Sequence, residues 1–501
     1  MKTKKTFLNI LTDVIPLIII AFLGIYKVKL FLRVLGSETL GLYQLFNNIM
    51  VYVAIVDGGL TSALLFSLYK PNTQGDKKKF NELLSGGLRT FSKIGMYVFG
   101  IAALVSFFII FLIKDSPFSY WYIVLTFILF SLSNVIEYFF VPYNALLEVK
   151  EKKYIYNIIT QTGQVLLSVV EIILLLLDVK FVFILISHSV IRIITKIIEV
   201  YVCKKEFPDV NVHEERKDYS FKKYLGSLMV HKVNGLIGSN IDSLIISSFL
   251  GLNAVAIYST YNYIITMLKN ILGKISSSMI ALVGNSLESN RNGMYDLYLE
   301  FNSMLFYIAI IVCTPLILAI NGFIDIFYEG KIETTMAIAI SFSAILFTFI
   351  VKMATTLFVS SGGLYKETKY CAITDTVVNL ILSLSLIHII GIPGVLIATA
   401  VSVTIAEYVL KTIVVHKHIF KKSARYYFVN NFKFITLFLI DLGVSYYLVK
   451  GVEISSLWSW LGFYLAFTIV NGLIILLIFK LLNETKFIHR FKILIQRKTV
   501  N

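Results

Sequence analysis

The chain has 501 residues, of which 57% are hydrophobic and 15% are charged, and its formal net charge is +16. Soluble proteins have about 45–50% apolar and about 25% charged residues, so this composition excludes a cytosolic enzyme, a secreted disulfide scaffold and a disordered tail. The three cysteines, Cys203, Cys313 and Cys371, form no CxxC pair, so the sequence indicates neither a metal site nor a disulfide framework.

Long apolar runs separated by short polar loops fill the chain, and a membrane-spanning helix needs about 20 apolar residues. The first run follows Lys2, Lys4 and Lys5 but has no small-residue cleavage site, so we predict a retained first helix. We predict an all-α integral membrane protein with about fourteen transmembrane helices. The predicted spans are 8–32, 40–68, 88–113, 119–146, 155–177, 181–202, 224–249, 254–282, 301–321, 334–360, 371–391, 393–415, 432–449 and 456–480.

The loop lysines and arginines predict the orientation, because positive charge marks cytoplasmic loops. One set of span ends carries 28 of these residues, including both termini, and the opposite set carries 7. Both termini are therefore predicted to be cytoplasmic, in a multi-pass membrane protein. The positive charge is accounted for by topology, so we expect no nucleic-acid partner.

Two segments recur at a nearly constant spacing. Leu35 to Tyr43 matches Leu250 to Tyr258 with an offset of 215, and Lys150 to Tyr154 matches Lys366 to Tyr370 with an offset of 216. Six predicted spans lie between equivalent points, so the two halves have the same orientation, as in transporters built from parallel repeats. The predicted organisation is a six-helix lobe at 1–202, a cytoplasmic connection at 203–223, a second six-helix lobe at 224–415, and two additional helices with a basic tail at 416–501.

A family resemblance rests on the Leu-Gly-x-x-x-x-Gly-x-Tyr motif after the first span and on its counterpart after the seventh. The sequence resembles the bacterial polysaccharide exporters that flip lipid-linked oligosaccharides, within the superfamily that also contains the MATE drug exporters. The resemblance covers about residues 1–415 and implies a V-shaped, two-lobed bundle that carries an undecaprenyl-diphosphate-linked sugar. The motif residues, for which it implies a structural role, are Arg33, Gly36, Gly41, Tyr43, Gly251 and Tyr258.

Basic residues inside the spans are the candidates for holding the diphosphate. Ionisable groups at membrane depth are costly and are therefore candidates for a functional site. Lys269 and Lys352 are the preferred candidates, and Lys269 lies deepest in its span. The alternative is that long basic side chains reach the membrane surface from near a helix end. The full candidate set is Lys269, Lys352, Lys274, Lys232 and Arg192.

Acidic residues inside the spans are candidates for coupling or gating. Asp57 precedes two glycines that allow a helix break, and Asp242 lies opposite Lys27 under the 215 offset, so that these two charges could pair in one state. A carboxylate beside irregular backbone can bind sodium or carry a proton, and the alternative is a salt bridge within the bundle. The coupling and gating candidates are Asp57, Asp242, Lys27 and Glu137, and Glu171, Glu407 and Asp441 are further acidic residues within spans. We expect no resident cofactor, and coupling to Na⁺ or H⁺ stays open.

These patterns predict a flippase for a lipid-linked oligosaccharide that works by alternating access in cell-surface polysaccharide synthesis. Its expected partners are the lipid-linked substrate, membrane lipids, and the polysaccharide polymerase and chain-length machinery. A cation-coupled multidrug exporter of the same fold is the first alternative. A membrane-embedded glycan polymerase or ligase is a weaker one, because every predicted outer connection is short, and a rigid scaffold for a biosynthetic complex is a further alternative.

Overall fold

The computed structural model describes residues 2–54, 59–224, 241–289, 293–452, 454 and 456–486, and these residues form helices and connecting turns without a strand. The chain divides into two compact units, Met1–Ala256 (unit 1) and Ile257–Asn501 (unit 2). The division falls inside one helix. The predicted lobe boundary at 203–223 stays a prediction, because most of the seventh span lies outside the described residues.

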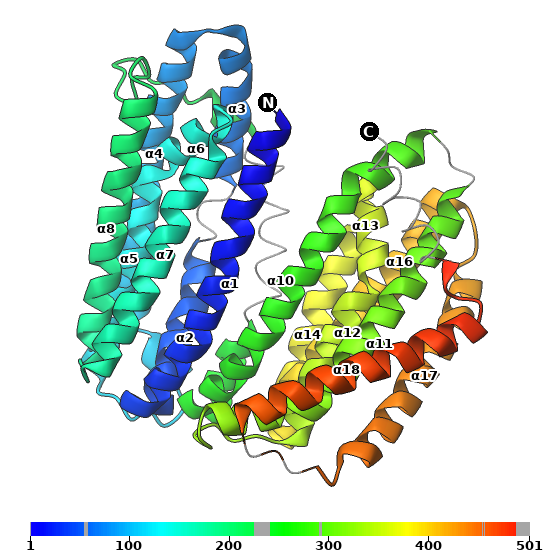
Figure 1. Cartoon of the computed structure of the whole chain (residues 1–501). Coiled ribbons are helices and arrows are strands. Elements are labelled where there is room, and N and C mark those ends of the chain that lie inside the picture. The colour runs from blue at the N-terminus through cyan, green and yellow to red at the C-terminus, as the bar shows by residue number, and fades with distance from the viewer. Residues whose placement is uncertain are drawn as a thin grey trace. The chain divides into compact units, whose positions relative to one another are not determined.

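Unit 1 is a bundle in which α1 packs on α7, α7 and α5 pack on α8, and α4 packs on α5 (Figure 1). The fourth span is interrupted by one turn of 3-10 helix, η3 (Ile136–Phe140), between α5 and α6. The helices are α1 (Lys2–Val34), α2 (Gly36–Val53), α3 (Leu60–Gln74), α4 (Lys77–Ser106), α5 (Tyr120–Val135), α6 (Val141–Val149), α7 (Lys153–Leu176) and α8 (Phe181–Glu206), followed by Ile241–Leu250.

Unit 2 is built around α11, which packs on α12, α17 and α18, while α15 packs on α14 and α12. The predicted span 334–360, the fourth of the second predicted lobe, is also interrupted, at Lys352 between α12 and α13. The elements are α10 (Leu252–Ser289), α11 (Met294–Phe327), α12 (Met336–Val351), α13 (Met353–Ser361), α14 (Lys369–Ile390), α15 (Ile392–Val403), the π-helical η6 (Thr404–Leu410), α16 (Lys411–Val415), the π-helical η7 (His416–Phe420), α17 (Arg425–Val449) and α18 (Leu457–Leu481).

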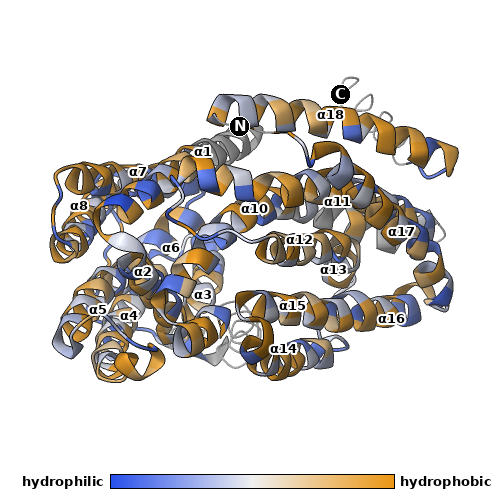
Figure 2. Ribbon diagram, turned by 90° about the horizontal axis from the view of Figure 1, so that it is seen from below, coloured by the Kyte–Doolittle hydropathy of each residue, from blue (hydrophilic) through white to orange (hydrophobic). Residues whose placement is uncertain are grey.

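Within the described part of the chain, ten helices are long and apolar enough to cross a membrane, and each overlaps a predicted span. The other predicted spans coincide with α1, with α2 and α3, with Ile241–Leu250 and with α10. Apolar residues dominate α15 and α18 (Figure 2), and large apolar side chains on α18 face outward, such as Ile469 at 63% exposure. The predicted all-α membrane fold is confirmed.

Two span predictions differ from the structure. Predicted span 40–68 corresponds to α2 and α3, because Gly59 has a φ of 87° and begins a new helix. Predicted span 88–113 corresponds to α4, which begins earlier, at Lys77. The Asp76 side chain accepts a hydrogen bond from the Lys79 N–H and caps that helix, as short polar residues do at helix starts.

The internal repeat is present in backbone and packing. Gly36 and Gly251, 215 residues apart, have φ angles of 84° and 85°, in the left-handed region that suits glycine. Gly36 is the first residue of α2 and Gly251 directly precedes α10, the two helices that carry the motif tyrosines. The same offset relates two buried aromatic pairs, Phe46–Phe127 in unit 1 and Tyr261–Phe342 in unit 2, whose ring centroids are 5.0 and 5.5 Å apart.

The segment after α8, residues 207–219, forms a strap along α4. Ser85 Oγ donates to the Val212 carbonyl at 2.8 Å, and the Asp218 N–H donates to the Glu82 carbonyl at 3.0 Å. Burial raises the pKa of Asp218, but hydrogen bonds from Lys79 and Ser220 outweigh burial and lower that pKa below its ordinary value. Asp218 therefore stays ionised and holds the strap to the start of α4.

Gly86→Ala should release the strap, because an added Cβ would lie 2.0 Å from the Asp218 carbonyl oxygen. Alanine stabilises a helix relative to glycine by about 0.5–1 kcal/mol. Any loss of strap docking would therefore come from this contact and not from a weaker helix. Trypsin cleavage at Arg216 and Lys217, measured over time, should speed up several-fold. Gly100→Ala, in the same helix with no atom within 4 Å of the added Cβ, is the matched control. Equal cleavage rates in the two variants would contradict the docking.

Candidate functional site

Unit 1 contains a buried charged cluster around Glu171 of α7. Its Oε2 lies 2.8 Å from Lys27 Nζ of α1, and its Oε1 lies 2.5 Å from His188 Nε2 of α8. The side chain of Glu171 is 1% exposed. The Tyr43 ring of α2 lies 5.7 Å from Lys27 Nζ and 6.0 Å from the His188 ring. The structure thus brings the predicted gating residue Lys27 and the motif residue Tyr43 to one carboxylate.

A second cluster in unit 1 surrounds Glu137 in η3. Arg192 Nη1 lies 3.4 Å from Glu137 Oε1, and Lys196 Nζ lies 2.8 Å from Glu137 Oε2. Lys196 Nζ also contacts Glu199 Oε2 at 2.9 Å, and the Lys196 side chain is 1% exposed. Arg192 and Lys196 lie one turn apart on α8, so that one helix face supplies both cations to the interruption in the fourth span.

Unit 2 has its own charged cluster, around Glu407 in the π-helical η6. Lys352 Nζ lies 3.5 Å from Glu407 Oε2, and Lys411 Nζ lies 2.5 Å from Glu407 Oε1. All three side chains are between 12% and 19% exposed. Asp375 of α14 is close enough to interact electrostatically with all three. Lys352 therefore shares one carboxylate with Lys411.

The clusters around Glu137 and Glu407 occupy equivalent positions in the repeat. In each half of the repeat the residue at the interruption of the fourth predicted span pairs with a residue 55 positions later in the sixth. The sign of the charge at each end of this pair is reversed between the units. The residues related by the 215 offset are Glu137 and Lys352, Arg192 and Glu407, and Lys196 and Lys411.

The two remaining described basic candidates lie on α10. Lys269 is half-buried, and its Nζ lies 5.8 Å from the centroid of the Phe349 ring on α12, within the range of a cation–π contact. Phe349 is one helical turn before Lys352. Lys269 on α10 and Lys352 therefore both lie beside the C-terminal end of α12. Lys274 is exposed.

No known sequence family and no curated protein matches the chain. Solved structures do. A structure described as "Lipid II flippase MurJ, inward closed conformation" aligns with a TM-score of 0.70 at 16% identity, over 96% of this chain and 100% of that one. The chain has a MurJ- and MATE-like fold. An inward-facing multidrug resistance MATE transporter aligns with a TM-score of 0.63 at 16% identity, over 80% of this chain and 96% of that one. An outward-facing one aligns with a TM-score of 0.53, also at 16% identity, over 82% and 95%.

In this MATE-like fold the motif residues lie at turns and close contacts. An added Cβ at Gly41 would lie 2.0 Å from the Leu252 carbonyl oxygen, so only glycine fits there. Tyr258 is 6% exposed and packs on Phe342 at 5.5 Å, while Arg33 is exposed at the end of α1.

The other gating candidates have different outcomes. Asp242 is buried, at 5% exposure, in the helix Ile241–Leu250. Lys27, its predicted counterpart, contacts Glu171. Asp57 and Lys232 lie outside the described residues. Within the described segments, no group of three or more His, Cys, Asp or Glu side chains could hold a metal ion.

Among the members of the charged clusters that sequence reasoning missed are Glu199 and Lys411. The available signal was local spacing: Glu199 is three residues after Lys196 and Lys411 is four residues after Glu407. Opposite charges at these spacings share a helix face, and inside an apolar helix they predict mutual neutralisation.

Proposed function

We propose that the chain is a flippase that moves an undecaprenyl-diphosphate-linked oligosaccharide from the inner to the outer leaflet of a bacterial plasma membrane by alternating access. The observation that carries this proposal is the likeness to the MurJ flippase, which covers 96% of this chain, whereas the two MATE transporters cover 80% and 82%. Both termini would be cytoplasmic. The polysaccharide polymerase and chain-length machinery would be its partners.

The physical task explains why such a lipid needs a protein. Each sugar hydroxyl buried in hydrocarbon without a partner costs about 2–7 kcal/mol, and moving one bare ion into low dielectric costs on the order of 20 kcal/mol. A protein lowers this barrier by offering polar groups to the sugars and cations to the diphosphate, while the lipid tail stays in the bilayer. An inside-negative potential helps a headgroup with two negative charges to move outward, by about 4–5 kcal/mol per 100 mV.

The proposed headgroup cations differ in their surroundings. Lys352 and Arg192 each contact a carboxylate of their own unit, which favours a positioning role for these two residues. Lys269 lies deepest in its span, beside the Phe349 ring, so it is the first choice for contacting the diphosphate, and Lys274, five residues later on α10, is the second. Lys232 stays a prediction.

Lys269→Gln should slow flipping about tenfold or more, because a hydrogen bond between charged groups contributes about 1.5–3 kcal/mol. The assay uses the purified chain in liposomes with a fluorescent undecaprenyl-diphosphate sugar, and follows access of a membrane-impermeant quencher to the headgroup. Lys331→Gln changes an exposed lysine in a loop and should leave the rate unchanged. An unchanged rate in well-folded Lys269→Gln removes Lys269 from the site, and no flipping by the unaltered chain removes the proposed function.

A multidrug exporter is the second candidate, favoured by the likeness to the MATE transporters. The basic residues at membrane depth argue for an anionic cargo, whereas a cationic drug would favour acidic surroundings. The same liposomes, loaded with an amphipathic cationic dye under an imposed Na⁺ or H⁺ gradient, separate the two functions. Gradient-driven dye transport without headgroup flipping would establish the exporter.

A further inference from the structure

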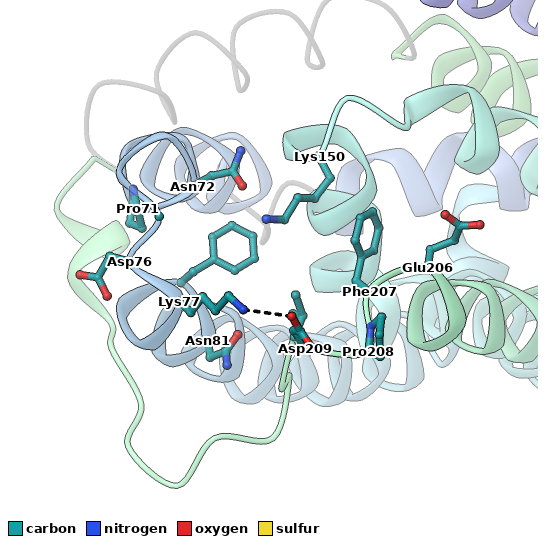
Figure 3. A pocket seen from close by; sticks show the side chains of 13 residues that line it. Pro71, Asn72, Asp76, Lys77, Asn81, Lys150, Glu206, Phe207, Pro208 and Asp209 are labelled. Carbon is teal, nitrogen blue, oxygen red and sulfur yellow. Dashed lines mark hydrogen bonds and ion pairs between the residues drawn. The ribbon is translucent and has the colours of Figure 1, made fainter.

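A cavity with a volume of about 260 Å³ opens at the end of unit 1 that carries many of its loop lysines. Three segments meet there: the turn between α3 and α4, the residue Lys150 after α6, and the start of the strap (Figure 3). The lining residues are Pro71, Asn72, Gly75, Asp76, Lys77, Phe80, Asn81, Lys150, Glu206, Phe207, Pro208, Asp209 and Val210. The positive-inside pattern predicts that this end faces the cytoplasm.

The acidic residues of this cavity already have partners. Asp209 Oδ2 lies 2.9 Å from Lys77 Nζ, and Glu206 pairs with Lys152 outside the cavity. Asp76 Oδ1 accepts the Lys79 N–H at 3.0 Å. Lys150 differs, because no carboxylate among the described residues lies within ion-pair distance of its Nζ.

Lys150 is a half-buried cation in a place that disfavours its charge. Its Nζ lies 4.8 Å from the centroid of the Phe80 ring and points into the cavity (Figure 3). Burial lowers the pKa of Lys150, and the nearby positive charge of Lys77 lowers it further. An anion in the cavity would compensate this charge, since an opposite charge nearby favours the charged form of a lysine.

We propose that this cavity binds a small phosphate ester, with the phosphate on Lys150 and assisted by Lys77. A phosphate monoester carries about 1.5–2 negative charges at pH 7, so it compensates Lys150 better than a single carboxylate does, and it can also accept from Lys77 while that lysine keeps its contact with Asp209. The Asn72 and Asn81 amides offer polar contacts, and the rings of Phe80 and Phe207 line the wall beside an attached organic group. The ester could be the headgroup of an acidic phospholipid or a soluble metabolite, and the shared chemistry is the phosphate.

The test uses the full chain in nanodiscs and does not depend on any transport assay. One arm adds glycerol 3-phosphate to nanodiscs of phosphatidylcholine, and the other arm replaces part of the phosphatidylcholine with phosphatidic acid, whose headgroup is a phosphate monoester. Binding is measured by calorimetry for the soluble probe, by native mass spectrometry for the lipid, and by the shift in melting temperature for both. Stabilisation by glycerol 3-phosphate assigns a soluble ligand, and stabilisation by phosphatidic acid alone assigns a lipid headgroup.

Lys150→Gln should weaken binding of the active probe at least tenfold and should leave the melting temperature without ligand equal to or above that of the unaltered chain. The second result follows because the variant removes an uncompensated cation. Lys150→Arg should keep most of the binding. Lys153→Gln is the matched control, since Lys153 is 45% exposed and pairs with Glu148 away from the cavity. Failure of both probes to bind, or equal binding by Lys150→Gln, would overturn the proposal.

Discussion

Glu137→Lys should destabilise the protein strongly, and Glu137→Lys combined with Arg192→Glu should restore most of the loss. The single change places a third positive charge beside Arg192 and Lys196. Removing one partner of a buried ion pair costs about 3–5 kcal/mol, and we expect the lower end because the Glu137 side chain is 38% exposed. The double variant reproduces in unit 1 the charge order that unit 2 already has at Lys352, Glu407 and Lys411.

The reciprocal exchange tests the same idea in unit 2. Lys352→Glu should destabilise, and Lys352→Glu with Glu407→Arg should recover, because the pair then has the polarity of unit 1. The measurement is the thermal unfolding midpoint of detergent-purified protein. It is the temperature at which heating removes half of the monomer peak in size-exclusion chromatography. A coupling energy of about 1–3 kcal/mol is expected in each double-mutant cycle. Double variants that are no more stable than the single variants would show that the equivalence has no energetic basis.

Glu171→Gln should be the most damaging neutral substitution in unit 1. The change leaves the partly buried Lys27 against a neutral group in place of a carboxylate, and it replaces the charged acceptor of His188 with an amide. The expected loss is about 3–5 kcal/mol, seen as a large fall in the thermal unfolding midpoint. Glu171→Gln combined with Lys27→Met should recover part of it, because the uncompensated charge is then absent.

Glu148→Gln is the control for this substitution, since it breaks an ion pair with Lys153 in which both side chains are at least 35% exposed. Exposed pairs contribute about 0–1 kcal/mol, so this variant should behave like the unaltered chain. Equal effects of Glu171→Gln and Glu148→Gln would mean that the buried cluster contributes no more than a surface pair.

The spans and the repeat could be predicted from the sequence because hydropathy and short motifs are local signals. Gly36 and Gly251 were visible as a repeated Leu-Gly, and the structure gives both the same left-handed backbone. The ion pairs could not be predicted in the same way. Lys352 looks like a lone cation in an apolar run, and its partner Glu407 lies 55 residues later in another span, a distance that one sequence does not connect.

The strap shows a second limit of sequence reasoning. The sequence predicts only a cytoplasmic connection at 203–223, because a docked segment such as the strap leaves no periodic pattern of apolar residues. The strap is held by backbone groups, such as the Val212 carbonyl, and by the absence of a side chain at Gly86. Such contacts depend on close approach in three dimensions, and a glycine inside a helix does not by itself predict them.

The reversed ion pairs restrict how this protein could have diverged from a duplicated ancestor. If both halves began with the same polarity, one half had to change two residues that lie in different spans, and the intermediate with only one change would have been unstable. The same restriction applies to protein engineering. A chimera in which the fourth span of one half replaces that of the other should be unstable unless the sixth span is transferred together with it.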